Sequence, residues 1–206
     1  VKSDPALAGY NAKANIYLQA ARDAVAIHEK PGDSKYIYSD NNWVEDGNAM
    51  YLKRPLNMSL AYGSALLAIY EATGDKSYLD RGTKIANYFK RQLTVNPATN
   101  GYYWKYFPGH SSYGNVIEDL SHSTLGTEFA YLGYKCGLFN DTDMQRFANT
   151  ATKTLARSNG SVAERLNGSG TSTQPGKFLH WLWFEPWAPS LLDTGYNIVK
   201  SRTSTY

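Results

Sequence analysis

The 206-residue sequence has a single cysteine, Cys136, and no long apolar run. One cysteine cannot form an intrachain disulfide or a multi-cysteine metal site. Because Cys136 falls inside an apolar helical pattern, we interpret it as a small buried residue of the core. No stretch of about 18 apolar residues occurs, so the sequence predicts no membrane-spanning helix.

The sequence is also poor in charge, with 19% charged residues and no runs of one sign. Its formal net charge of +3 comes from Lys and Arg residues that are scattered along the chain. A nucleic-acid-binding protein is expected to concentrate its positive charge, so we predict no nucleic-acid partner. The mild basicity permits an acidic ligand without requiring one.

Aromatic residues are abundant, at 14% of the chain with 17 tyrosines and 5 tryptophans. Such enrichment together with low charge fits a polymer-binding surface outside the cell. Four Asn-x-Ser/Thr sequons, at Asn57, Asn140, Asn159 and Asn167, would accept glycans in a secreted eukaryotic protein. We therefore expect a secreted glycoprotein.

Apolar residues at three- and four-residue steps predict about six main helices. No break in composition separates them, so residues 1–206 are expected to form one all-α domain. Short extended pieces are expected only at residues 36–38 and 178–184. The predicted helices cover approximately residues 5–30, 54–73, 76–93, 119–136, 141–155 and 188–200.

An internal repeat links two helical hairpins, residues 62–88 and 126–152. Each has a helix with small residues, a Gly-Asp or Asn-Asp turn, and a second helix with an Arg near its start. Stacking such hairpins side by side would bring their polar helix starts to one rim. Those starts are Arg54 with Asn57, then Glu118, Asp119 and His122, and finally Glu185 with Trp187.

Residues 101–129 are the stretch in which chemistry concentrates. An aromatic cluster and a Pro-Gly turn lead into Glu118, Asp119 and His122, where a new amphipathic pattern begins. Aromatic faces bind sugar rings, and two carboxylates with an imidazole within five residues can move protons. This combination predicts a carbohydrate-active site.

The repeated hairpins resemble the α/α toroid, or incomplete α/α barrel, of polysaccharide lyases, uronyl epimerases and six-hairpin glycosidases. The resemblance rests on the segments RPLNMSLAYGSALLAIYEATGDKSYLDRGTKIANYF and YYWKYFPGHSSYGNVIEDLSHSTLGTEFAYL. Full toroids have more hairpins than the three or so visible here. Either the chain is a short, open member of this group, or a second copy completes its cleft in a homodimer.

The resemblance also implies a reaction, β-elimination on a polymer that contains uronic acid. By residue type His122 is the base or acid, Tyr106 or Tyr103 is its partner, and Arg54 with Asn57 neutralises the carboxylate. Asp119 and Glu118 belong to the same catalytic group. No cofactor is expected, and the histidine spacing does not match a zinc site. Further predicted substrate contacts are Tyr102, Trp104, His180, Trp181, Trp183, Glu185 and Trp187.

Several alternatives stay open at this level. Asp119 and His122 also fit an ordinary helix cap with its satisfied neighbour, and Trp residues serve cores as well as sugar platforms. A glycoside hydrolase would instead use two carboxylates, Glu118 or Asp119 with Glu185. A uronyl epimerase would use nearly the same residues as a lyase. A noncatalytic helical module would bind glycans through its concave face.

Overall fold

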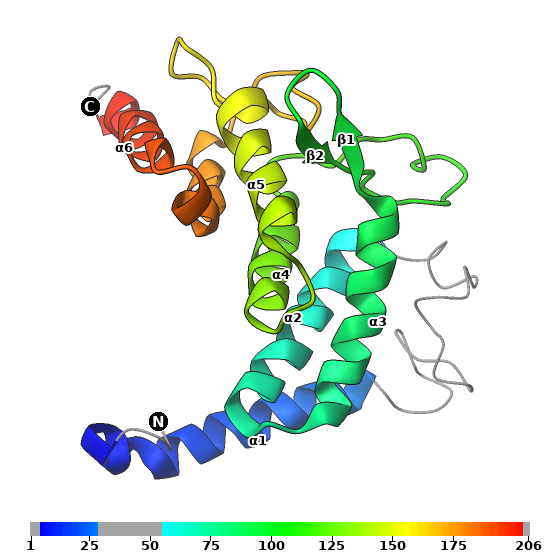
Figure 1. Cartoon of the computed structure of the whole chain (residues 1–206), viewed down its shortest axis with the longest axis vertical. Coiled ribbons are helices and arrows are strands. Elements are labelled where there is room, and N and C mark those ends of the chain that lie inside the picture. The colour runs from blue at the N-terminus through cyan, green and yellow to red at the C-terminus, as the bar shows by residue number, and fades with distance from the viewer. Residues whose placement is uncertain (1–4, 29–54, 204–206) are drawn as a thin grey trace.

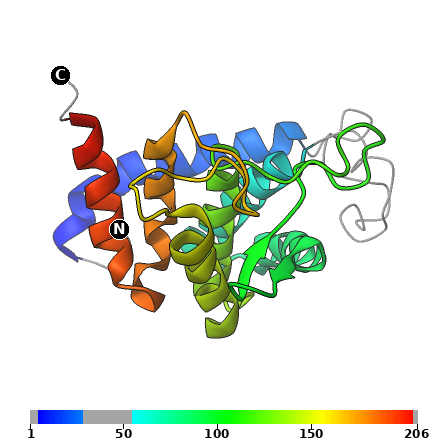
Figure 2. The same ribbon diagram turned by 90° about the horizontal axis from the view of Figure 1, so that it is seen from above.

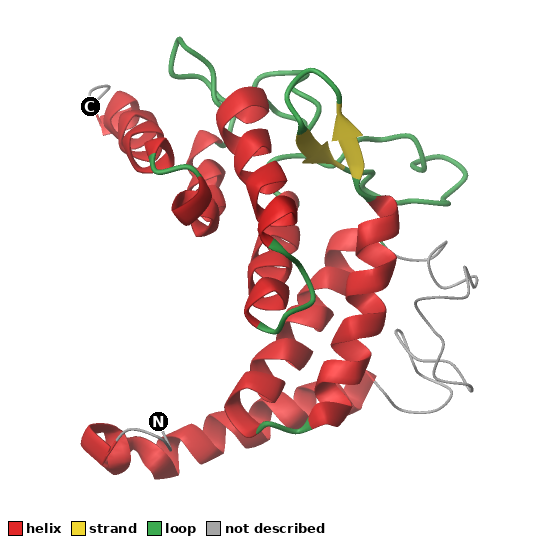
Figure 3. Cartoon of the chain, viewed as in Figure 1, coloured by secondary structure: helices red, strands yellow, loops and turns green. Residues whose placement is uncertain are grey.

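The computed structural model of the chain describes residues 5–28 and 55–203. This part of the chain is mostly helical, with one small two-stranded sheet, which confirms the predicted all-α class (Figure 3). Arg54 and the extended piece expected at residues 36–38 lie outside the described residues. None of the described helices is long and apolar enough to cross a lipid bilayer.

The described elements follow the predicted order, with some changes of type. The short helix η1 (Pro5–Tyr10) leads into α1 (Asn11–His28). A 3-10 helix precedes the last α-helix, where the sequence predicted an extended piece. The remaining elements are α2 (Leu56–Thr73), α3 (Lys76–Gln92), β1 (Thr94–Asn96), β2 (Gly101–Tyr103), α4 (Ser123–Lys135), α5 (Asp141–Asn149), the π-helix η3 (Thr150–Leu155), the 3-10 helix η4 (Pro175–Trp187) and α6 (Ser190–Thr203).

The first predicted hairpin is confirmed by the turn between α2 and α3. Gly74 adopts a left-handed conformation with φ of 73°, which glycine tolerates, and its N–H donates to the carbonyl of Tyr70. One residue later, the side chain of Asp75 accepts from the N–H of Ser77 and caps α3. The chain therefore reverses direction within two residues.

The second hairpin, α4 with α5, begins with the same kind of turn. Gly137 has φ of 76°, and Asn140 and Asp143 form a reciprocal capping box at the start of α5. The repeat read from the sequence is thus a repeat of structure as well.

The hairpins stand side by side in an open arc (Figures 1 and 2). Helix α2 packs against α3 and α4, α4 packs against η4, and η4 packs against α6. The first helices of the three pairs, α2, α4 and η4, are therefore neighbours. Helix α1 contacts α2 at one end of the arc, and α6 packs on η4 at the other end.

Small residues allow this close packing. A Cβ added at Gly63 of α2 would lie 2.5 Å from the ring of Phe129 of α4, and one added at Gly82 of α3 would lie 2.5 Å from Leu67. Both distances are too short for a real contact, so any larger residue would push the helices apart. Glycine is needed here for proximity rather than for backbone freedom.

The 3-10 helix η4 corrects the expectation of an extended piece at residues 178–184. Its buried side chains, Phe178, Trp181 and Phe184, recur at steps of three. A 3-10 helix has three residues per turn, so this spacing places all three on one face. The signal was present in the sequence, but it matches neither the period of a strand nor that of an α-helix.

Three further details differ from the predictions. The hairpin of β1 and β2 was not expected, because strands of three residues are too short to show alternation. Helix α4 begins at Ser123, several residues after the predicted start near Asp119. Cys136 is half-buried and packs against the edge of the core.

Candidate functional site

The site begins with a loop that folds back on itself between β2 and α4. The N–H of Glu118 donates to the carbonyl of Trp104, and the N–H of Tyr106 donates to that of Val116, both at 2.9 Å. The carbonyl of Tyr106 accepts from the N–H of Leu56 at 2.9 Å. These bonds place Tyr106 between the start of α2 and the start of α4.

A second segment fixes the same residues from the opposite side. The N–H of Leu120 donates to the backbone carbonyl of Glu164 at 2.8 Å, and the N–H of Leu166 donates to the backbone carbonyl of Glu118 at 3.0 Å. Asp119 faces Arg165 across this short antiparallel bridge. The backbone of residues 118–120 is therefore bonded to two segments that are distant in sequence.

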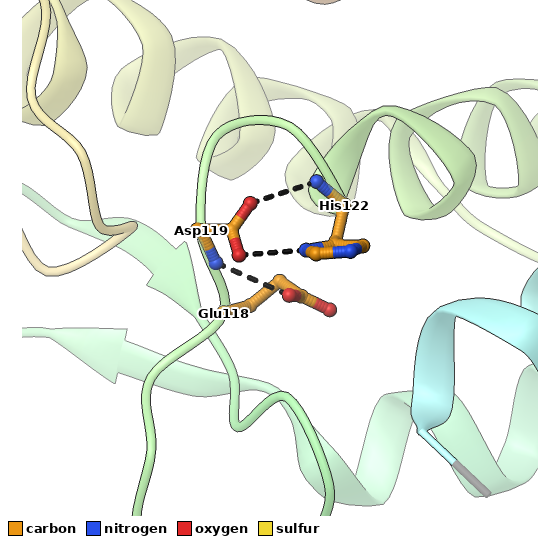
Figure 4. A group of neighbouring side chains, drawn as sticks. All are labelled: Glu118, Asp119 and His122. Atoms are coloured by element: carbon orange, nitrogen blue, oxygen red, sulfur yellow. Dashed lines mark hydrogen bonds and ion pairs between the residues drawn. The ribbon is translucent and has the colours of Figure 1, made fainter. Parts of the chain in front are cut away.

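Asp119 and His122 form a tightly bonded pair (Figure 4). One carboxylate oxygen of Asp119 accepts from the backbone N–H of His122 at 2.9 Å, and the other lies 2.7 Å from Nδ1 of the imidazole. His122 is the N-cap residue of α4 and no side chain caps that helix, so Asp119 is not the helix cap that was considered as an alternative. Its carboxylate stabilises the turn before α4 and orients the ring. With Nδ1–H donating to the carboxylate, Nε2 carries the lone pair.

The surroundings keep Asp119 ionised and leave His122 accessible. Burial opposes ionisation of Asp119, but the bonds from the His122 backbone and ring outweigh it and lower the pKa of Asp119. The side chain of His122 is 48% exposed, whereas that of Asp119 is 13% exposed. The dyad therefore has a buried anion and an imidazole that solvent can reach.

Tyr106 lies beside the imidazole, with its ring centroid 5.2 Å from that of His122. Burial raises the pKa of Tyr106, and the nearby charges of Glu118 and Asp119 raise it further. Its hydroxyl consequently stays protonated near neutral pH. Tyr106 is suited to donate a proton rather than to accept one.

Glu118 is fully buried beneath this group. Its Oε1 accepts from the N–H of Asp119 at 3.1 Å, and its Oε2 has no hydrogen-bond partner among the described residues. Burial, followed by the charge of Asp119, raises the pKa of Glu118 to about 8. Neighbouring carboxyls at 118 and 119 therefore have pKa values that move in opposite directions.

Arg165 completes the group and was not predicted. Its Nη1 donates to the carbonyl of Ile117 at 3.0 Å and lies 3.6 Å from Oδ2 of Asp119. It belongs to a Gly- and Ser-rich stretch that the sequence indicated only as a long surface loop. Nothing local in the sequence connects it with a histidine that precedes it by 43 positions.

Ligand-type atoms of Glu118, Asp119 and His122 lie within 4.8 Å of one another, a spacing that metal sites also show. Here Nδ1 and Oδ2 already bond to each other, and one oxygen of Glu118 bonds to a backbone N–H. We interpret the group as an acid–base cluster, because these bonds account for the arrangement without an ion.

Three aromatic residues predicted to contact substrate are core residues instead. Trp104 is 1% exposed and Trp181 is fully buried, and the two rings stack at a centroid distance of 6.3 Å. Tyr102 is buried too, and its hydroxyl donates to Asp143 and accepts from Arg146. All three rings belong to the buried core and offer no face to a ligand, which corrects their assignment.

Residues near the start of α2 are likewise covered. Asn57 is 6% exposed, and its Oδ1 has no partner among the described residues. This burial argues against the predicted role in clamping substrate. Tyr103 is half-buried on β2 and packs against the core, while Tyr106 is the tyrosine that contacts the imidazole.

The third polar helix start does not join the other two. Trp187 packs on Tyr134 at 4.9 Å and donates from Nε1 to Asp141. Tyr134 follows His122 by twelve residues, about 18 Å along a helix. The predicted single rim is therefore wrong for Trp187, and Glu185 lies only two residues before it on η4.

Two predicted contacts on η4 are open to solvent. Trp183 is 43% exposed and stacks on Tyr131 of α4 at a centroid distance of 4.9 Å. His180 is exposed on the same helix. Among the tryptophans predicted to contact substrate, Trp183 is thus the exposed one.

The chain was compared with protein-family models, with curated proteins and with solved structures, and none of the three comparisons finds a match. The functional interpretation therefore depends on the geometry of the site.

Proposed function

We propose that the chain is an acid–base enzyme acting on carbohydrate, and specifically a polysaccharide lyase that cleaves a uronic-acid polymer by β-elimination. In this proposal the open arc of hairpins is an incomplete α/α toroid, and the protein acts as a secreted glycoprotein. The observation that carries the proposal is the contact of Tyr106 with an imidazole that Asp119 holds in one orientation.

The two rings have complementary roles in the reaction. The Nε2 lone pair of His122 removes the proton on C5 of a uronate, and the electrons of that bond form the C4–C5 double bond. The C4–O bond breaks, and the hydroxyl of Tyr106 protonates the departing oxygen. The proton on His122 then returns to Tyr106, which restores the starting state.

Asp119 supports this sequence without contacting the reacting atoms. Its carboxylate fixes the tautomer that leaves Nε2 free, and it stabilises the imidazolium that forms when His122 takes up a proton. Its low exposure keeps that interaction out of bulk water.

A two-carboxylate hydrolase has less support. Both oxygens of Asp119 are engaged by His122, and the free oxygen of Glu118 is buried. Glu185 lies toward the other end of α4, next to Trp187. A nucleophile or a water-activating base needs an oxygen that substrate or water can reach.

The test is incubation with a panel of polyuronates while following the ultraviolet absorbance of the unsaturated product. We expect absorbance to rise with at least one polymer. The rate of that rise should be lower by roughly 100- to 10,000-fold in both His122→Ala and Tyr106→Phe. New reducing ends without the unsaturated product would instead indicate hydrolysis. Solvent deuterium at C5 without cleavage would indicate an epimerase, and no change in any polymer would favour a binding module.

A further inference from the structure

The segment that carries Arg165 contains two copies of one short motif. Arg157-Ser-Asn-Gly-Ser161 and Arg165-Leu-Asn-Gly-Ser169 lie eight residues apart and share the pattern Arg-x-Asn-Gly-Ser. In each copy the Arg N–H donates to the carbonyl of the Ser, and the Gly N–H donates to the carbonyl of the Arg. Each copy is thus a closed turn with a left-handed glycine.

The asparagine of each motif stabilises its own turn. In both copies the Asn Oδ1 accepts from the backbone N–H and the hydroxyl of the Ser two residues on, the latter at 2.7 Å. The stretch predicted as a surface loop is therefore an ordered pair of turns.

The two arginines have different tasks. The guanidinium of Arg157 donates to the carbonyls of Gly168 and Gly170 and to the hydroxyl of Thr171, so it holds the second turn against the first. The guanidinium of Arg165 contacts Ile117 and Asp119 through Nη1 alone. Its Nε and Nη2 have no partner among the described residues, and its side chain is 35% exposed.

This arrangement leaves one edge of a guanidinium open next to the dyad. Nε and Nη2 form the planar fork that matches a carboxylate. The Nη1 contact places Arg165 on the same carboxylate that orients His122. Its charge also offsets that of Asp119, so the surroundings of the imidazole do not repel an anion.

We infer that Arg165 is the residue that recognises a substrate carboxylate, binding it through Nε and Nη2 while Nη1 remains on Ile117 and Asp119. The inference rests on the proposed function and names the group that binds the carboxylate next to the reacting carbon. It assigns to Arg165 the role that the resemblance implied for Arg54 and Asn57.

The test compares acidic sugars with their uncharged forms. Short oligomers of glucuronate, galacturonate, mannuronate and guluronate are titrated into the whole chain by calorimetry, each beside its methyl ester. We expect at least one acid to bind more tightly than its ester, and Arg165→Gln to weaken binding of that acid by about 10- to 100-fold while leaving the ester unchanged. Lys153→Gln, which removes an exposed charge elsewhere, should preserve the preference.

Arg165→Lys keeps the charge but not the planar fork of donors. Its affinity for the acid should therefore lie between those of the wild type and Arg165→Gln. If Arg165→Gln does not fold, the wild-type chain still tests the inference through the His122 ring signals in NMR. These should shift with the acid and much less with the ester, and equal shifts would contradict the inference.

Equal affinity for acid and ester in every pair, or an undiminished preference in folded Arg165→Gln, would overturn it. The two proposals fail separately. An Arg165-dependent preference without unsaturated product would reject the lyase alone, whereas unsaturated product with an unchanged KM in Arg165→Gln would reject the role of Arg165 alone.

Discussion

The two ends of helix α4 carry similar residues and have different chemistry. At the far end, Asp141 accepts from the hydroxyl of Tyr134 and from the indole of Trp187, both of which are uncharged groups. At the near end, Asp119 bonds to an imidazole whose Nε2 has no partner among residues 5–28 and 55–203, and it lies beside a guanidinium. An acidic residue next to aromatic rings is therefore not enough to define an acid–base site. The acidic residue must also bond to a group that can take up a proton, as Asp119 bonds to the imidazole of His122.

The largest expected effect separates the two ends directly. Asp119→Asn should lower kcat roughly 100-fold or more, because the amide no longer favours the tautomer with a free Nε2. Asp141→Asn, the matched change at the far end, should leave kcat within about twofold, since it touches no group of the dyad. Steady-state kinetics on the active polyuronate measures both, and equal losses would contradict the comparison.

The second prediction concerns the neighbouring carboxyls 118 and 119. The folded-state pKa of Glu118 is raised to about 8, so the folded chain retains a proton that the unfolded chain releases near the ordinary pKa of 4.5. Stability from this group is present below that lower value and is lost as pH rises toward about 8, at up to about 1.4 kcal/mol per pH unit.

Urea denaturation from acid to mildly alkaline pH should therefore show a slope in the wild type that Glu118→Gln removes. Asp119 has the opposite sign, because its pKa is lowered, and its stabilisation should be lost as pH falls through its folded-state pKa. An unchanged slope in Glu118→Gln would show that Glu118 is ionised when buried.

A smaller effect is expected at the exposed ring between the two ends. Trp183→Ala should weaken oligosaccharide binding by about three- to tenfold, because an exposed indole ring can stack on a sugar ring. Trp187→Phe keeps an aromatic ring at the far end and should not change affinity. Calorimetric titration distinguishes them, and equal affinities for all three proteins would exclude Trp183 from the binding surface.

The smallest effect concerns stability alone. Asp141→Ala removes the acceptor for Tyr134 and Trp187 and a negative charge at the start of α5, which should cost about 1 kcal/mol of unfolding free energy. Thermal and urea unfolding measure it. A loss of activity at unchanged stability would mean that the far end takes part in function after all.

Local features of the structure could be predicted from the sequence by itself. Apolar spacing indicated the helices, and Gly74 and Asn140 marked the turns of the two hairpins. The spacing of three residues predicted that Asp119 and His122 are neighbours, although the two meet in the turn before α4 and not on the helix itself. Each of these signals lies within a few residues of the feature that it predicts.

Tertiary structure alone decided which residues are accessible and which distant ones meet. Some residues are of types that are common in sugar-binding surfaces but are buried here, namely Trp104, Trp181 and Asn57. Their exposure depends on how the hairpins pack. Arg165 reaches Asp119 only because two turns fold its segment back onto residues 118–120. Burial and contacts between distant residues are properties of the packed chain, and for that reason no short stretch of sequence encodes them.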